Sequence, residues 1–320
     1  MSRLSLEETG RHMVAVVQST TDSITRRARR RARLTAVLSD YWMLTKPEVN
    51  FLIVLTTFAG FYLGSPPRPW RTLLLFNTLL GTLLVASGTG TLNQYIERNF
   101  DSLMRRTSRR PLPAGRIVHV HALWFGLVLS IAGGLWLAVF VNLIASLIAL
   151  LTLATYLLFY TPLKRRTPLC TLVGAFPGAA PPLIGYAAST GRIASEAWLL
   201  YAILFLWQFP HFMAIAWMYR EDYARAGYLT LPSGQQRTHF MVWQTLVFSI
   251  ALVPITLVPS FLRQAGVVYF VAVLLLSSAF LYYSARLAIL KSNQAARRLL
   301  FASIVYLPAV LGLIVGFKNG

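Results

Sequence analysis

The chain has 320 residues, of which 56% are hydrophobic and 12% are charged, and its net charge is +20. A soluble core cannot bury this much apolar surface, so the composition excludes an ordinary soluble domain and favours a bilayer as the solvent. The single cysteine, Cys170, excludes an internal disulfide and leaves no cysteine cluster for a metal.

Residues 1–48 form a polar, basic segment that contains the run RRARRRAR at Arg26–Arg33. Such a run lies near anionic lipid headgroups, so we expect it to help set the orientation of the chain. No short apolar stretch precedes a small-residue cleavage site, so no cleavable signal peptide is predicted. We predict two parts, a basic cytoplasmic tail over residues 1–48 and a membrane domain over residues 49–320.

After the tail, long apolar runs alternate with polar connections. A helix needs about 20 residues to cross a bilayer core. Nine runs are long enough to be candidates, and few charges fall inside them. The predicted fold is therefore an all-α integral membrane protein with nine spans. The spans are residues 49–64, 72–95, 118–140, 142–160, 170–190, 196–218, 239–260, 265–285 and 299–316.

Successive connections between spans lie on alternate sides of the membrane. On this assignment the thirty Lys and Arg residues are divided very unevenly between the two sides. Twenty-five fall on the side of the N-terminus and five on the other. Because positively charged connections stay in the cytoplasm, we predict a multi-pass protein of the cell (inner) membrane. Its N-terminus is cytoplasmic and its C-terminus lies on the opposite side. No nucleic-acid partner is expected, since the cations of the tail have lipid to pair with.

The first acidic cluster follows the second span, in the string NQYIERNFDSLMRRTSRRPLPAG at Asn93–Gly115. Asn93, Glu97 and Asp101 are four residues apart and share one face of a helix. They would present a column of hard oxygen atoms, the ligands that Mg²⁺ prefers when it is shared with a substrate phosphate. Carboxylates at a membrane boundary are costly to desolvate, so we interpret this cluster as functional.

Arginines come directly after these acids, at Arg105, Arg106, Arg109 and Arg110. Guanidinium groups match phosphate oxygens, so acids and arginines together favour a metal-bound diphosphate. Proline and glycine after residue 110 end the helix, and we expect the arginines to lie on a loop that bends back toward its end. The alternative is a salt-bridged helix end whose arginines only set topology.

Two further segments on the same side carry charge. The string YTPLKRRTP at Tyr160–Pro168 places Lys164 four residues after Tyr160 and adds Arg165 and Arg166, although an ordinary basic helix end explains it equally well. After the sixth span come Glu221 and Asp222. Two acidic helix ends can face each other across one cavity and hold two or more metals around one diphosphate.

With these residues the sequence resembles the UbiA superfamily of membrane prenyltransferases over about residues 40–316, and within it the protoheme IX farnesyltransferases. The resemblance is carried by Asn93–Leu112, by YTPLKRRTP, and by WQFPHF at Trp207–Phe212 followed by Asp222. It implies a UbiA-type helix bundle with a central cavity that opens near the cytoplasmic side.

The chain departs from the pattern of the family in two places. Superfamily members commonly carry two aspartates four residues apart in the second acidic motif, whereas Asp222 has Met218 before it and Ala226 after it. The family often has asparagine shortly after KRRTP, where this chain has Cys170 and Thr171. The second metal position is therefore less well defined by the sequence than the first.

The resemblance implies transfer of the farnesyl group of farnesyl diphosphate to a vinyl group of heme b, which is a substrate and not a cofactor. Mg²⁺ is the expected cofactor, held by Asn93, Glu97, Asp101, Glu221 and Asp222. The expected catalytic residues are Asn93, Glu97, Asp101, Arg106, Arg110, Lys164 and Asp222. The expected substrate-binding residues are Arg105, Tyr160, Arg165, Arg166, His211, Trp207 and Tyr223.

His211 lies well inside the sixth span. It either contacts the heme iron, a propionate or a proton, or is a buried histidine bonded to a neighbouring helix. Trp207 and Tyr223 either line an acceptor site or belong to the aromatic belt at the membrane surface.

Two other functions remain open from the sequence. The same fold could prenylate an aromatic quinone precursor, and Glu97 together with WQFPHF favours heme over that acceptor. A transporter is less favoured, because the acids lie at one face and no inverted repeat is visible. The expected partners are farnesyl diphosphate, heme b and the bilayer, and the resemblance adds a heme A synthase or terminal oxidase assembly proteins.

Overall fold

The computed structural model describes residues 31–66, 71–232, 234, 236–261 and 266–318. Every regular element in these ranges is a helix, which confirms the predicted all-α class. The chain separates into two units, Met1–Met43 and Leu44–Gly320. In the first unit residues 31–43 are helical. The basic run at Arg26–Arg33 lies outside the described residues except for its last three positions.

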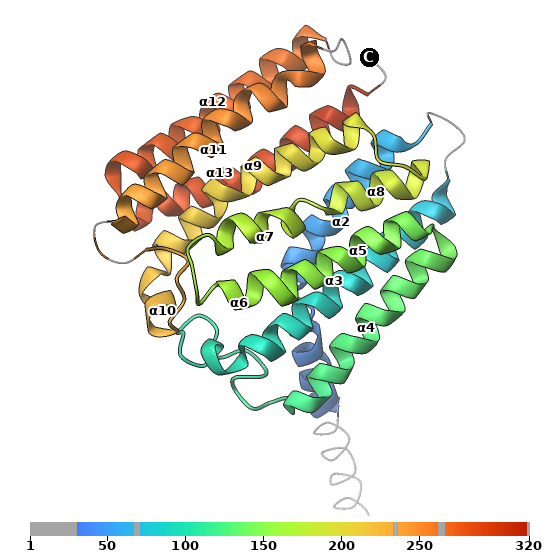
Figure 1. Ribbon diagram of the computed structural model, residues 1–320, viewed down its shortest axis with the longest axis vertical. Coiled ribbons are helices and arrows are strands. Elements are labelled where there is room, and N and C mark those ends of the chain that lie inside the picture. Colours follow the sequence, from blue (N-terminus) through green and yellow to red (C-terminus); the bar gives the residue numbers. More distant parts are fainter. Residues whose placement is uncertain (1–30, 67–70, 233, 235, 262–265, 319–320) are drawn as a thin grey trace, which may run out of the picture. The chain divides into compact units, whose positions relative to one another are not determined.

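Eight helices of the second unit are long and apolar enough to cross a bilayer. Figure 1 shows most of them lying side by side with their axes roughly aligned. This arrangement is that of a multi-pass membrane bundle. The helices are α2 (Pro47–Gly64), α3 (Thr72–Asp101), α4 (His119–Phe140), the continuous stretch Leu143–Leu163, α9 (Ser195–Met218), α11 (Gln236–Phe261), α12 (Val267–Leu290) and α13 (Asn293–Gly316).

The fifth predicted span, residues 170–190, is not one continuous helix. It consists of α7 (Cys170–Gly178) and α8 (Pro181–Thr190), which follow each other end to end in Figure 1. Proline has no backbone N–H and clashes with the turn before it, so Pro181 and Pro182 start a new helix and do not extend α7. Eight of the nine predicted spans are thus single long helices within the described residues, and the remaining one, residues 170–190, is the broken pair α7 and α8.

The stretch Leu143–Leu163 changes its winding before it ends. It begins as α5 (Leu143–Ala154), passes through a π-helical segment, η1 (Thr155–Tyr160), and closes with the single turn α6 (Thr161–Leu163). Segments of π-helix are rare, and those that occur are often found at functional sites. This one is separated only by α6 from the basic string that starts at Lys164.

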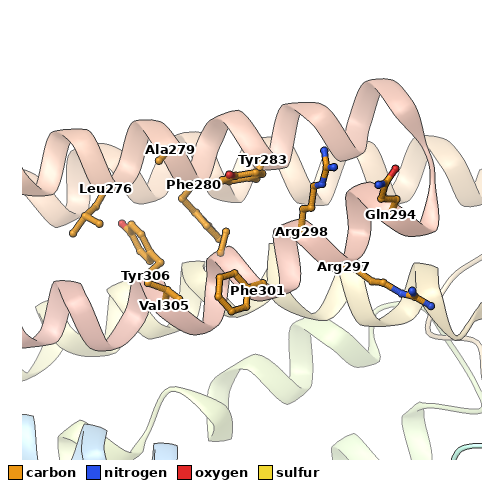
Figure 2. A pocket seen from close by; sticks show the side chains of 11 residues that line it. Leu276, Ala279, Phe280, Tyr283, Gln294, Arg297, Arg298, Phe301, Val305 and Tyr306 are labelled. Atoms are coloured by element: carbon orange, nitrogen blue, oxygen red, sulfur yellow. The ribbon is translucent and has the colours of Figure 1, made fainter.

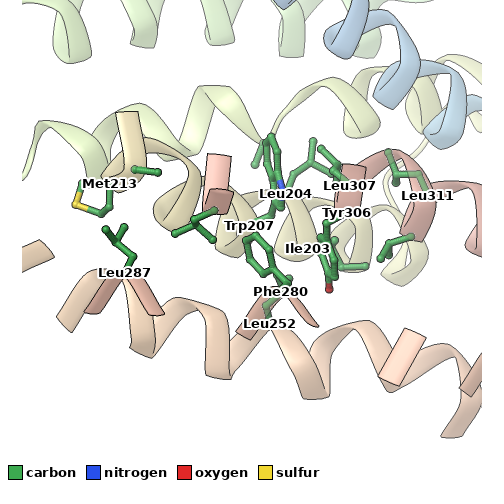
Figure 3. Close-up of a cluster of buried hydrophobic side chains, with 14 of the residues drawn as sticks. Ile203, Leu204, Trp207, Met213, Leu252, Phe280, Leu287, Tyr306, Leu307 and Leu311 are labelled. Carbon is green, nitrogen blue, oxygen red and sulfur yellow. The ribbon is translucent and has the colours of Figure 1, made fainter. Parts of the chain in front are cut away.

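A large apolar core joins α9, α11, α12 and α13. Figure 3 shows Trp207 and Leu204 of α9 close to Tyr306 and Leu307 of α13, with Phe280 of α12 beside them. The rings of Phe280 and Tyr306 stack with their centroids 4.7 Å apart. This core fixes α9, the helix that carries His211 and leads into Asp222.

Helices α2 and α8 approach each other through glycine. A Cβ added at Gly185 would lie 1.9 Å from the carbonyl oxygen of Thr57, and one added at Gly60 would lie 2.1 Å from that of Pro182. Small residues at helix contacts let backbones approach closely in membrane proteins. The second half of the broken pair is therefore held against α2 at backbone distance.

We expect Gly185→Ala to destabilise the protein, because the new methyl group overlaps a backbone oxygen that cannot move without shifting α2. The expected loss is about 1–3 kcal/mol, read as a lower melting temperature in detergent. Gly312→Ala is the matched control, since no heavy atom lies within 4 Å of its added Cβ. Equal melting temperatures for the two variants would contradict the close contact of α2 with α8.

Candidate active site

The last turns of α3 bury three polar side chains in a column. Asn93, Glu97 and Asp101 are 1%, 5% and 1% exposed and repeat every fourth residue. Helix α3 runs to Asp101, beyond the predicted end of the second span at residue 95. The two acids are therefore fixed by helix geometry and do not hang from a loop, as the shared face predicted.

A positive side chain lies against each acid of the column. Lys164 Nζ donates to Glu97 Oε1 at 2.7 Å, and Arg110 Nη1 donates to Asp101 Oδ2 at 2.8 Å. The loop between α3 and α4, residues 102–118, carries the arginines that follow the acids and is called the arginine loop. It bends back toward α3, as expected from its prolines. A buried carboxylate without such a partner would be very costly. The column is therefore stable with its charge compensated from two other segments of the chain.

Lys46 completes the column at its inner end, and sequence reasoning missed it. Its Nζ donates to Asn93 Oδ1 at 2.6 Å. The backbone of Lys46 has φ 55°, an uncommon value for a residue other than glycine. Residues held in such conformations cluster at functional sites. A single lysine directly before Pro47 gives no periodic signal, so only its three-dimensional position identifies it.

The two half-buried lysines beside the column differ in pKa because their partners differ. Burial, reinforced by the nearby charge of Arg110, lowers the pKa of Lys46 to about 7. Burial alone would lower the pKa of Lys164 too, but the Glu97 carboxylate outweighs it and holds that pKa above its usual value. Lys164 is therefore charged when it faces the column.

The π-helical segment η1 positions the far side of the column. Asn93 Nδ2 donates to Thr161 Oγ1 at 3.1 Å, and Thr161 Oγ1 donates to the carbonyl oxygen of Tyr156 at 2.9 Å. Lys164 Nζ lies 4.5 Å from the ring centroid of Tyr160, a cation–π contact. The orientation of Asn93 is thus fixed on both of its side-chain atoms, by Lys46 and by Thr161.

The second acidic motif reaches the same end of the bundle. Asp222 lies in α10 (Arg220–Arg225) and is 8% exposed. Its Oδ2 accepts a hydrogen bond of 3.2 Å from the backbone N–H of Arg106, and Arg225 pairs with Oδ1. The loop after α3 is therefore tied to both acidic motifs. The guanidinium of Arg106 lies over the Tyr219 ring, 5.0 Å from its centroid.

Apolar packing and one backbone hydrogen bond hold the segment that carries Asp222 in place. Met104 of the arginine loop packs with Ala226 and Tyr228 in a small buried cluster, to which Tyr223 adds its half-buried ring. The backbone N–H of Leu229 donates to the carbonyl oxygen of Lys164. The segments after α3, α6 and α9 thus meet at one end of the membrane domain.

Tyr228 was not predicted as a site residue. Its hydroxyl is buried without a hydrogen-bond partner of normal geometry. Burial and the negative charge of Glu97 raise the pKa of Tyr228. Lys164 Nζ lies 5.9 Å from its ring centroid. A buried, unpaired hydroxyl is costly, so the Tyr228 O–H group can donate to an acceptor atom of a ligand that binds beside it.

Some predicted residues lie outside this group. The side chain of Glu221 is 81% exposed, with Arg220 at 3.9 Å, so the structure does not bring it to the column. Arg105 and Arg166 are exposed. Arg165 is also exposed, and its guanidinium lies 4.1 Å from the ring centroid of Phe100.

His211 and Trp207 are joined to α13. His211 Nδ1 lies 2.7 Å from Ser303 Oγ, and Trp207 Nε1 donates to the carbonyl oxygen of Ser303 at 2.9 Å. The two rings stack with centroids 4.9 Å apart. His211 is thus bonded to a neighbouring helix, one of the two arrangements that the sequence allowed.

The donor set suits a hard cation. Asn93, Glu97, Asp101 and Asp222 supply amide and carboxylate oxygens, the ligands of Mg²⁺. Within the described ranges, no three His, Cys, Asp or Glu side chains lie close enough to hold a metal by themselves. Mg²⁺ commonly takes one or two carboxylates and completes its shell with water and substrate phosphates. The residues therefore fit a cation that binds together with a phosphate ligand.

Comparison with known proteins agrees with this geometry. The model of the UbiA prenyltransferase family matches residues 53–305. The chain therefore belongs to the UbiA prenyltransferase family.

Its curated relatives include proteins named protoheme IX farnesyltransferase. The protein of Solibacter usitatus (strain Ellin6076) is 48% identical over 88% of this chain and 100% of its own length. Those of Salinibacter ruber (strain DSM 13855 / M31) and Aquifex aeolicus (strain VF5) are 42% and 35% identical, each over 87% of this chain, and they are covered over 98% and 95% of their lengths.

Solved structures share the fold. A digeranylgeranylglyceryl phosphate synthase superposes with a TM-score of 0.70 at 19% identity, covering 88% of this chain and 98% of that one. A UbiA homolog from Archaeoglobus fulgidus bound to GPP and Mg²⁺ gives a TM-score of 0.55 at 14% identity, covering 86% and 99%. The predicted UbiA-type bundle is confirmed.

We expect Lys164→Met to destabilise the protein by about 3–5 kcal/mol, because it leaves the buried Glu97 carboxylate unpaired. The double variant Glu97→Gln/Lys164→Met should recover most of that loss, since it removes both charges. Thermal unfolding in detergent without substrate measures both. If the double variant is as unstable as the single one, the ion pair is not what stabilises this end of α3.

Proposed function

We propose that this chain transfers the farnesyl group of farnesyl diphosphate to a vinyl group of heme b, giving heme O and diphosphate. The observation that carries the proposal is the buried column of Asn93, Glu97 and Asp101 with cations against it. The relatives named protoheme IX farnesyltransferase, at up to 48% identity, support this choice of donor and acceptor.

The proposed metal site consists of Asn93, Glu97, Asp101 and Asp222. Mg²⁺ bound there would supply positive charge to a diphosphate that the carboxylates alone would repel. The UbiA homolog from Archaeoglobus fulgidus that was solved with GPP and Mg²⁺ has the same fold, which supports this cofactor. Asn93 is held by two hydrogen bonds, so its oxygen is oriented before any ligand arrives.

Lys164, Arg106 and Arg110 stabilise the leaving group. Lys164 and Arg110 are bonded to the acids in the described structure, and a bound diphosphate gives them a second anionic partner. The bond from the allylic carbon to oxygen breaks, and its electron pair leaves with the diphosphate. Donors aimed at that oxygen in a dry site lower the barrier, because the charge develops where positive groups already lie.

The acceptor step follows from the chemistry of the vinyl group. The vinyl π-electrons form the new carbon–carbon bond to the allylic carbon, which leaves a cation on the carbon next to the porphyrin ring. Water adds to that carbon and loses a proton, which gives the hydroxyl group of heme O. The apolar helices around the site keep bulk water from capturing the allylic cation first.

His211, Trp207 and Tyr223 are the proposed acceptor residues. The ring of His211 is fixed by Ser303 and by stacking on Trp207. A ring held in this way is suited to contact the heme iron, a propionate or the proton released in the water step. Tyr160, Arg105, Arg165 and Arg166 complete the proposed substrate-binding set.

The proposed location is the cell inner membrane, with the N-terminus in the cytoplasm and the C-terminus on the other side. The excess of Lys and Arg on one side supports this orientation. Contact with a heme A synthase or terminal oxidase assembly proteins is proposed from the reaction product. Co-purification from native membranes that recovers neither would overturn that contact.

The function is tested with purified protein in lipid, supplied with heme b, farnesyl diphosphate and Mg²⁺. We expect heme O, identified by its mass. Prenylation of an aromatic quinone precursor in place of heme would keep the fold and the metal site but overturn the proposed acceptor.

We expect Asp101→Asn to lower kcat by about 10²-fold or more, because it removes a charged metal ligand and the partner of Arg110. Glu196→Gln is the matched control, since Glu196 accepts from Tyr186 and Ser195 away from the column. Both are measured as initial rates of heme O formation. Full activity of Asp101→Asn would remove this residue from the site.

We expect Tyr228→Phe not to lower thermal stability without substrate, because its buried hydroxyl makes no hydrogen bond of normal geometry there. If that hydroxyl donates to a diphosphate oxygen, the variant should bind farnesyl diphosphate about tenfold more weakly, the effect of one hydrogen bond to a charged group. Isothermal titration measures the affinity. Unchanged affinity would show that Tyr228 does not contact the substrate.

A further inference from the structure

Apart from the candidate active site, the described residues form an open groove between α12 and α13. Its volume is about 500 Å³. One end of the groove is apolar and is lined by Leu276, Phe280 and Val305. At the opposite end Tyr283, Gln294 and Arg298 lie together (Figure 2). The groove thus has the two-part chemistry of an amphiphile.

The polar end of the groove carries charge that the chain does not neutralise. Arg297 and Arg298, in the first turns of α13, are exposed and form no ion pair with a described residue. The sequence after Asp222 contains no Asp or Glu, so α11, α12 and α13 offer no acidic partner. An anion for these two arginines must therefore come from another element or from outside the chain.

The groove opens outward from the bundle. Phe301 and Val305 on its wall are 70% and 49% exposed. Ser303 of α13 accepts from Trp207 and contacts His211, so these proposed acceptor residues lie on another face of the helix. From Arg298 to Tyr306 the helix rises about 12 Å, enough to follow the upper half of an acyl chain.

We infer that this groove binds an anionic phospholipid. The phosphate pairs with Arg298, since a guanidinium group binds phosphate oxygens in a fork, and Tyr283 and Gln294 beside it supply further polar contacts. Arg297, at the next position of α13, adds positive charge at the same end of the groove. One acyl chain lies along Phe280, Phe301 and Val305. The site is independent of the proposed transferase chemistry and requires no metal.

The test uses the full-length protein in nanodiscs of phosphatidylcholine with a small fraction of a photoactivatable lipid. The probe is phosphatidylglycerol in one sample and phosphatidylcholine in the other, with the photoreactive group on the acyl chain. After illumination, peptide mapping locates the adducts. We expect phosphatidylglycerol to label peptides of α12 and α13 about tenfold more than phosphatidylcholine does.

Three variants decide the role of the arginines. Arg297→Ala/Arg298→Ala should reduce labelling by phosphatidylglycerol to the level of phosphatidylcholine, and Arg297→Lys/Arg298→Lys should retain most of the preference. Arg286→Ala is the matched control, because Arg286 of α12 already bonds to the Tyr282 hydroxyl, and it should change nothing. The melting temperature of each variant establishes that it is folded.

Two results would overturn the inference. Equal labelling by both lipids means that the groove holds bulk lipid without selecting charge. Loss of the phosphatidylglycerol adducts on addition of one equivalent of heme b means that the groove takes a porphyrin dicarboxylate and not a phospholipid.

Discussion

Two carboxylates buried at the end of a membrane helix are very costly unless positive groups lie beside them. Glu97 meets this condition through Lys164, and Asp101 through Arg110. These cations come from the segments after α6 and α3, so the site is formed by the fold of the whole membrane domain and not by α3 alone. A diphosphate needs cations of this kind, so the pairs that stabilise the carboxylates also suit the anionic substrate that we propose.

The bundle is adapted to keep these segments together. The π-helical turn at Thr155–Tyr160 places Thr161 on Asn93 and Lys164 on Glu97 within one short stretch. The arginine loop is bonded to Asp222 through its backbone, which ties the end of α9 to the end of α3. Irregular backbone in a membrane protein is tolerated where protein surrounds it, and here it lies beside the column.

The sequence predicted the helices because long apolar runs leave few alternatives in a bilayer, and it predicted the acidic column because a spacing of four is a property of one helix. It did not predict the break within residues 170–190, since hydropathy averages over prolines. Lys46 and Tyr228 were missed because each depends on a contact distant in sequence that no local pattern records. Glu221 was included because it adjoins Asp222, but neighbouring residues on a helix point in different directions.

We propose that the column binds diphosphate through Mg²⁺. Isothermal titration of farnesyl diphosphate into the detergent-solubilised protein, with Mg²⁺ or with a chelator and without heme, tests it directly. We expect Mg²⁺ to tighten binding by at least about tenfold, because without it the carboxylates repel the ligand. Equal affinity under both conditions would mean that the cations of the chain alone hold the diphosphate and that the acids serve only to balance them.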